Sequence, residues 1–179
     1  IMSSLENKGY LENAIVVFMS DHGDCIGDHG HIQKWTMYDA VTRIPAIVWA
    51  PGKLPEGKRT DALIQHMDLV PMLFELAGVD QPSYSGAQSA LPVALDKSQG
   101  RDAVFAELAG RGADEYLHMV RTHDWKLVHY LNEPDIGELY DLVADPSERQ
   151  NLWTQPEHDN IKTELLGVLR EWHLRQSAA

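Results

Sequence analysis

Ala14-Ile15-Val16-Val17-Phe18-Met19, followed at once by Ser20-Asp21-His22-Gly23-Asp24-Cys25-Ile26-Gly27-Asp28-His29-Gly30-His31-Ile32-Gln33-Lys34, is the stretch that decides the predicted fold. Its first six residues are apolar, rich in β-branched side chains and too few for a helix, which predicts a strand buried on both faces. Such strands are typical of parallel sheets covered by helices, where ligands bind beyond the carboxyl ends of the strands. We therefore expect residues 20–34 to form a functional loop.

This loop concentrates groups that bind cations and anions. Asp21 and His22 offer a carboxylate oxygen and an imidazole nitrogen, a pair that suits a divalent cation but does not complete its ligand shell. Lys34 adds an ammonium group, which beside a metal would hold a tetrahedral oxyanion and stabilise charge on its ester oxygen. Each residue taken singly fits a solvated, glycine-rich surface loop equally well, whereas the ensemble after a buried strand favours a functional site.

The loop and the residues after it carry a family resemblance. The pieces are, in order, Ser20-Asp21-His22-Gly23-Asp24, Gly27-Asp28-His29-Gly30, Lys34, Tyr38-Asp39, Arg43-Ile44-Pro45 and Ala50-Pro51-Gly52. They resemble the carboxyl-terminal portion of the formylglycine-dependent sulfatases of the arylsulfatase type, in the alkaline phosphatase superfamily. The resemblance implies an α/β fold, the C-terminal part of an alkaline-phosphatase-like α/β sandwich followed by a small antiparallel β-sheet subdomain with a C-terminal helix.

The resemblance also implies roles for loop residues. Asp21 and His22 would be metal ligands, with Ca²⁺ expected and Mn²⁺ as the alternative. Lys34 would contact the sulfate ester and serve in both catalysis and substrate binding. His29 is a second catalytic candidate, which would position the substrate or protonate the leaving oxygen. His31 is a substrate-binding candidate, because the family often has an apolar residue at this place.

One element of the family is not found in these residues. Its nucleophile is a formylglycine made from a Cys/Ser-x-Pro/Ala-x-Arg motif, and Cys25 is followed by Ile-Gly-Asp instead. The family's upstream metal-binding Asp pair is not found either. We therefore expect the chain to be a fragment, with the formylglycine in a missing N-terminal part of the same protein, and we expect the fragment alone to be inactive.

The chain is expected to divide into three consecutive segments. Residues 1–80 would be the α/β part, with a second buried strand at 43–50, a short strand near 62–64, and a helix that is capped by Asp68 and stopped by Gly78. Residues 81–100, rich in Pro and Gly, would be an irregular link. Residues 101–179 would be the small antiparallel sheet and its closing helix, with strands expected at 103–107, 116–121, 125–130 and 138–142 and the helix at about 156–172.

The composition bears on nucleic-acid binding, membrane spans, disulfides and the compartment of the protein. The 179 residues carry a net charge of −12, which argues against nucleic-acid binding. No apolar run approaches the roughly 20 residues that span a bilayer. The single Cys excludes an intrachain disulfide. The compartment stays open between periplasmic, extracellular and cytoplasmic.

The leading hypothesis is a sulfuric ester hydrolase that acts on a sulfated small molecule or saccharide. The alternatives are a phosphodiester or phosphonate monoester hydrolase of the same superfamily, because sulfate and phosphate esters place similar demands on such a site, and a non-catalytic sulfatase-like module. His118, His123 and His129 are the remaining histidines that could belong to a site. In strands, His118 would share a face with Val120 and His129 with Leu127.

Overall fold

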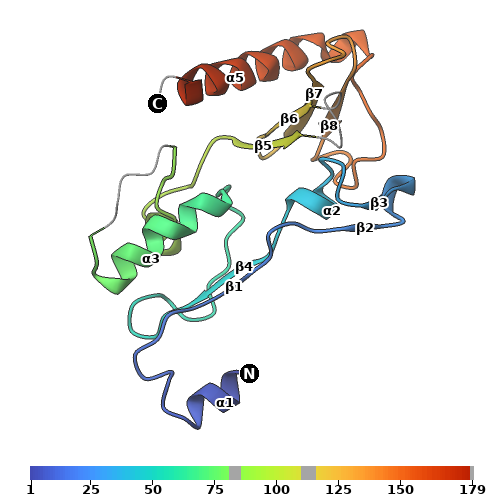
Figure 1. Ribbon diagram of the computed structural model, residues 1–179. Helices are drawn as coiled ribbons and strands as arrows, with labels where there is room; N and C mark the ends of the chain where they lie inside the picture. Colours follow the sequence, from blue (N-terminus) through green and yellow to red (C-terminus); the bar gives the residue numbers. More distant parts are fainter. Residues whose placement is uncertain (81–85, 110–115, 178–179) are drawn as a thin grey trace. The chain divides into compact units, whose positions relative to one another are not determined.

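The computed structural model describes residues 1–80, 86–109 and 116–177 (Figure 1). The chain forms two compact units, which are described separately: residues 1–21 with 45–100, and residues 22–44 with the segment from 101 onward. The units are not consecutive in sequence, and the three consecutive segments expected above stay a prediction. Within the described residues, no helix has the length and apolar character that crossing a membrane requires.

The first unit packs short helices on a two-stranded ribbon. Its core is formed by Ala50, Leu69, Met72, Leu76 and Ala90. The elements are α1 Met2–Glu6, β1 Val16–Met19, β4 Ala46–Trp49, η2 His66–Asp68, α3 Leu69–Ala77 and α4 Leu91–Ala94.

The direction of the first strand pair corrects the expectation of parallel, doubly buried strands. β1 pairs antiparallel with β4, with Phe18 opposite Ile47. Met19 and Val48 lie on the other face of the ribbon and pack against the core of the unit. Phe18 is 62% exposed and Ile47 60% exposed, so the described residues leave the ribbon uncovered at this pair. An unbroken apolar run predicts a strand but does not encode the direction of its partner.

Helix α3 ends where expected, but its other details differ from the prediction. Gly78 stops the helix at φ 68°. The helical spacing of Val70, Leu73, Phe74 and Ala77 predicts one buried face, whereas Leu69, Met72 and Leu76 are buried. Apart from Glu75 the helix is apolar, so its sequence does not single out one face.

Asp68, expected to cap α3, instead accepts hydrogen bonds from the backbone N–H groups of Gln65 and Gln88, both at 2.8 Å. The short strand expected before η2 is reduced to an isolated bridge between Leu63 and Gly100.

The second unit contains the predicted antiparallel sheet and closing helix. Its four strands are in the order β5-β6-β7-β8, and α5 lies along one face of the sheet (Figure 1). The sheet and its cover comprise β5 Val104–Ala109, β6 Tyr116–Arg121, β7 Trp125–Tyr130, β8 Gly137–Asp141, η3 Pro156–His158 and α5 Asp159–Ser177. The loop contributes β2 Cys25–Ile26, η1 Asp28–Gly30, β3 Ile32–Gln33 and α2 Asp39–Thr42.

Strand alternation gives this sheet two differently covered faces. On one face, Val120, Leu127 and Leu139 lie side by side in register and pack against α5 through Leu165 and Leu169. On the opposite face, Met119 and Val128 pack against Met37, which follows the loop. The segment 22–44 is therefore held on the sheet face away from α5.

Candidate functional site

Gly23, near the start of the loop, stands at a position that no larger residue can occupy. The Gly23 N–H donates to the carbonyl of Val41 at 2.8 Å, which ties the loop to α2. A Cβ atom on Gly23 would lie 1.9 Å from the carbonyl oxygen of Ala40. Any larger residue would push α2 away from the start of the loop.

His22 and Lys34 come together across the loop. Lys34 Nζ lies 2.7 Å from His22 Nε2, and His22 Nδ1 lies 2.7 Å from the carbonyl oxygen of Gly23. Because a carbonyl only accepts, Nδ1 carries the proton, and the lone pair of Nε2 accepts a hydrogen bond from the ammonium. The local fold thus places the lone pair of His22 on Nε2, where a bound cation would take the place of the ammonium.

Asp21 is the last residue of the first unit, and His22 is the first residue of the second. The Asp21 side chain is exposed, and its Oδ1 lies 3.4 Å from the hydroxyl of Ser20. The two predicted metal ligands are adjacent in sequence, and their joint geometry depends on how the units are arranged.

His29 and His31 both lie beside one aromatic ring. The ring of His29 stacks on Tyr38 with centroids 3.7 Å apart and planes 5° apart, and the His31 ring lies 5.9 Å from the same ring. His29 has a φ of 53°, in the left-handed region, between Gly27 at 116° and Gly30 at 75°. Stacking on Tyr38 supports this strained backbone, so the two predicted histidines are placed by a residue outside the loop.

A pocket of about 380 Å³ opens beside these rings. The Tyr140 hydroxyl donates to Glu138 Oε2 at 3.0 Å, and Tyr130 donates to the other carboxylate oxygen at 2.7 Å. Burial, followed by the charge of Glu138, raises the pKa of Tyr140 far above its usual range, so its hydroxyl stays protonated. The pocket is lined by His29, Tyr38, Glu138, Tyr140, Glu148, Arg149 and Asn151.

Aromatic rings together with hydroxyl, carboxylate and guanidinium groups suit a polar, hydroxyl-rich ligand. Sequence reasoning did not find this pocket, because it predicted residues 138–142 only as a strand of the small sheet. The available signal was that Glu138 and Tyr140, two residues apart in a strand, share one face of the sheet.

A buried ion network holds the segment that carries Tyr38. Lys126 has no exposed surface, and its Nζ lies 3.0 Å from the Met37 carbonyl and 2.5 Å from Asp39 Oδ1. Lys126 also pairs with Glu148, which accepts the Asp39 backbone N–H at 2.7 Å. Arg121 Nε adds a second cation at 3.4 Å from Asp39.

Burial alone would raise the pKa of Asp39, but attraction to Lys126 and then to Arg121 outweighs it and lowers the pKa below its ordinary value. Sequence reasoning could not distinguish this carboxylate from a surface one. The network positions the loop and leaves Asp39 ionised at neutral pH.

Cys25 and the three histidines of the C-terminal sheet lie outside the pocket and away from Lys34 in the contacts they make. Cys25 is fully buried with its Sγ 3.9 Å from Thr36 Oγ1, which fits a packing role. His123 is exposed in the turn between β6 and β7, and His129 lies 6.2 Å from the Trp153 ring. His118 is buried under α5, as its shared face with Val120 predicted; burial, followed by the neighbouring His173, lowers its pKa.

A family model and the curated relatives of this chain carry names of the same class of enzyme. Residues 27–175 match the family model described as N-sulphoglucosamine sulphohydrolase, C-terminal. Over 96% of its length the chain is 32% identical to an N-acetylglucosamine-6-O-sulfatase of Bacteroides thetaiotaomicron, and over 98% it is 34% identical to a Δ4,5-hexuronate-2-O-sulfatase of the same organism. The chain spans only about a third of the length of these relatives, 32% and 38% respectively.

Solved structures superpose on nearly the whole chain. A protein in complex with its substrate D-glucosamine-2-N,6-O-disulfate superposes on 99% of the chain with a TM-score of 0.87 and 31% identity, and the chain covers 37% of it. A phosphonate monoester hydrolase of Silicibacter pomeroyi superposes on 97% with a TM-score of 0.85 but 23% identity, and the chain covers 37% of it. At this identity, the similarity to the phosphonate monoester hydrolase shows a shared fold only.

Proposed function

The chain belongs to the sulfatase family, and from that premise we propose that the protein containing it is a metal-dependent sulfuric ester hydrolase. Sulfatases generally use a formylglycine and a divalent metal. We place the formylglycine in the part of the relatives that this chain does not cover. The chain would then supply one half of the active site, because its loop offers metal ligands and a lysine but no formylglycine motif.

The contact between Lys34 and His22 is the observation that carries this proposal. The ammonium and Nε2 are 2.7 Å apart, so an anion held by one would lie within reach of a cation held by the other. This is the pairing that a sulfate ester needs, because charge develops on its oxygens as the ester bond breaks. Lys34 is exposed and therefore accessible to a substrate.

The residues present fit a divalent metal. The Nδ1 contact with Gly23 leaves the lone pair of His22 on Nε2, where a metal would displace the Lys34 ammonium, and the neighbouring Asp21 adds an exposed carboxylate. When bound, a divalent metal would act as a Lewis acid and polarise an oxygen of the ester. We propose Ca²⁺ as the ion and Mn²⁺ as the alternative, because Ca²⁺ favours oxygen ligands while Mn²⁺ also accepts imidazole.

The other loop residues would act on the substrate directly. Lys34 would bind a sulfate oxygen and stabilise charge as it develops. His29, stacked on Tyr38 at the pocket wall, would hold the leaving group or give it a proton. His31, on the same aromatic ring, would contribute to the choice of substrate.

A sulfated saccharide is the proposed substrate class. The named relatives act on sulfated hexosamine and hexuronate units. The pocket beside Tyr38 and Tyr140 offers protonated hydroxyl groups and the Glu138 carboxylate, which match the hydroxyl and amino groups of a sugar. Both relatives have similar identity to this chain, so we test both sugars.

Sulfate release by the intact protein is the decisive measurement. Glucosamine 6-sulfate, an unsaturated hexuronate 2-sulfate and a phosphonate monoester would be offered separately, and product would be followed by ion chromatography. We expect a sulfated sugar to be preferred. Replacing Lys34 by Ala should lower kcat/KM by about 100- to 1,000-fold, the range known for loss of one oxyanion-stabilising group. Lys8→Ala, an exposed lysine of the first unit, is the matched control.

Each competing function has its own outcome. Preference for the phosphonate monoester would assign the protein to the alternative hydrolase class. No turnover of any ester by an intact, formylglycine-containing protein would favour a non-catalytic module.

A further inference from the structure

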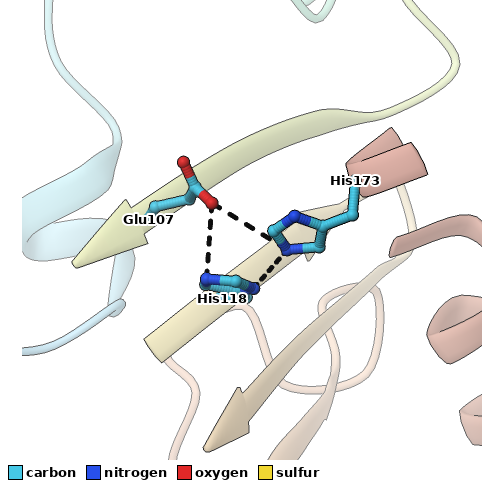
Figure 2. Close-up of side chains that lie close together, drawn as sticks. All are labelled: Glu107, His118 and His173. Carbon is cyan, nitrogen blue, oxygen red and sulfur yellow. Dashed lines mark hydrogen bonds and ion pairs between the residues drawn. The ribbon is translucent and has the colours of Figure 1, made fainter. Parts of the chain in front are cut away.

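Three metal-binding side chains converge on the α5 side of the sheet, away from the loop. Figure 2 shows Glu107 of β5, His118 of β6 and His173 of α5 pointing toward one another. Glu107 Oε1 lies 3.3 Å from His118 Nε2 and 3.9 Å from His173 Nε2. The second nitrogen of His118, Nδ1, forms a hydrogen bond with His173 Nε2. One ligand atom from each residue lies within 4.8 Å of the others.

Two independent sequence patterns create this convergence. Strand register places Glu107 opposite His118, and both share the face that α5 covers. On α5, Leu165, Leu169 and His173 are each four residues apart, which extends the buried stripe of the helix by one turn. A helix that packs its leucines on the sheet core therefore sets His173 above His118.

The surrounding rings hold His173 in place. Phe105 and Trp172 stack with centroids 4.7 Å apart, and Trp172 meets His173 edge-on at 4.9 Å. His118 is 8% exposed and the His173 side chain 34%, so the imidazoles are packed rather than free in solvent. Ligands held in this way lose little conformational freedom when a cation binds.

The donor set and its spacing fit a borderline-soft cation. In tetrahedral zinc sites with bonds of about 2.0–2.1 Å, neighbouring ligand atoms lie about 3.3 Å apart. The distance of 3.3 Å from Glu107 Oε1 to His118 Nε2 has this value. The 3.9 Å to His173 Nε2 would have to shorten, and His173 would have to exchange its hydrogen bond with His118 Nδ1 for the cation. Two imidazoles and one carboxylate are a known zinc combination that leaves a fourth position for water.

We propose that Glu107, His118 and His173 form a binding site for a Zn²⁺-class divalent cation. The bound ion would link β5, β6 and α5 and so fasten the closing helix to the sheet. The site uses none of the residues assigned to the sulfate ester, and it does not depend on the proposed function. Without a cation, the same three residues would be an ordinary hydrogen-bonded cluster, and titration with metal separates the two.

The test is calorimetric titration of the intact protein with Zn²⁺ after removal of metals, in buffer that contains saturating Ca²⁺. Loss of even an outer partner of a metal ligand weakens metal binding about 10- to 100-fold. We therefore expect His173→Ala and Glu107→Gln to lose one equivalent of bound Zn²⁺, or to weaken it by about 100-fold or more. His123→Ala, an exposed histidine of the same unit, should bind as wild type does.

Two further measurements guard against an unfolded variant. Circular dichroism of the metal-free proteins checks the fold, and Glu107→Gln keeps a side chain of the same size at a position that is half exposed. Co²⁺ should give the intense visible absorption of a tetrahedral site in wild type and in His123→Ala alone. Wild type that binds no Zn²⁺, or folded variants that bind it as tightly as wild type, would overturn the proposal.

Discussion

Lys126 Nζ lies 2.5 Å from Asp39 Oδ1, and the lysine has no exposed surface. The two residues are 87 positions apart, and their pairing fastens the loop segment to the antiparallel sheet. Glu148, a buried carboxylate, completes the network beside the half-buried Asp39. This contact holds Asp39 and its neighbour Tyr38 on the sheet, and Tyr38 in turn stacks on His29 of the loop at the pocket wall.

Replacing Lys126 by Met should strongly destabilise the protein. Removing one partner of a buried ion pair leaves uncompensated charge, at a cost of about 3–5 kcal/mol. Here two carboxylates, Asp39 and Glu148, would lose their cation. Chemical denaturation of the intact protein measures the change. Lys97→Met, at an exposed position, should shift the free energy of unfolding by less than about 0.5 kcal/mol, and an equal effect of both variants would contradict the assigned role.

Stability at acid pH should depend on Asp39. Its pKa in the folded protein is lowered from the ordinary 3.8, so the ionised form stabilises the fold above that value and the contribution is lost as pH falls through the lowered pKa. In this window the unfolded chain binds more protons, so stability rises with pH. Asp39→Asn should flatten the stability curve below about pH 4. Urea titrations between pH 2 and 6 compare the slopes, and identical slopes would refute the prediction.

Removing the Tyr140 hydroxyl should affect substrate binding more than turnover. Tyr140→Phe leaves Glu138 without one of its two tyrosine donors and removes from the pocket a hydroxyl oxygen that can accept from a sugar. We expect KM for the sulfated sugar to rise several-fold while kcat changes little, because binding is lost equally in ground and transition states. Tyr116→Phe, at an exposed tyrosine of β6, is the control. A fall in kcat at unchanged KM would argue against a sugar subsite.

Metal titration of the loop ligands should identify the ion. Ca²⁺ takes roughly six to eight oxygen ligands, so Asp21→Ala should weaken Ca²⁺ binding more than His22→Ala does. The reverse order would point to Mn²⁺, which accepts imidazole readily. Calorimetry of the intact protein decides between them. If both variants bind metal as tightly as wild type, the pair is not the metal site, and the role of Lys34 fails with it.

Local patterns in the sequence determined the family and most of the elements. The pieces from Ser20 to Gly52 carried the resemblance to the family, and the family model that matches residues 27–175 agrees with it. The strands of the C-terminal sheet and the helix beginning near Pro156 followed from alternation and helical periodicity, which short segments express by themselves. Gly78 marked a helix end for the same reason.

Only the tertiary structure decided which distant residues meet. The antiparallel pairing of β1 with β4 and the buried face of α3 depend on what packs against them, since β1 is apolar throughout and α3 is apolar except for Glu75. Lys126 and Glu148 look like surface charges until the fold buries them over Asp39. Glu107, His118 and His173 come together only because strand register and helix packing bring three separate elements to one place.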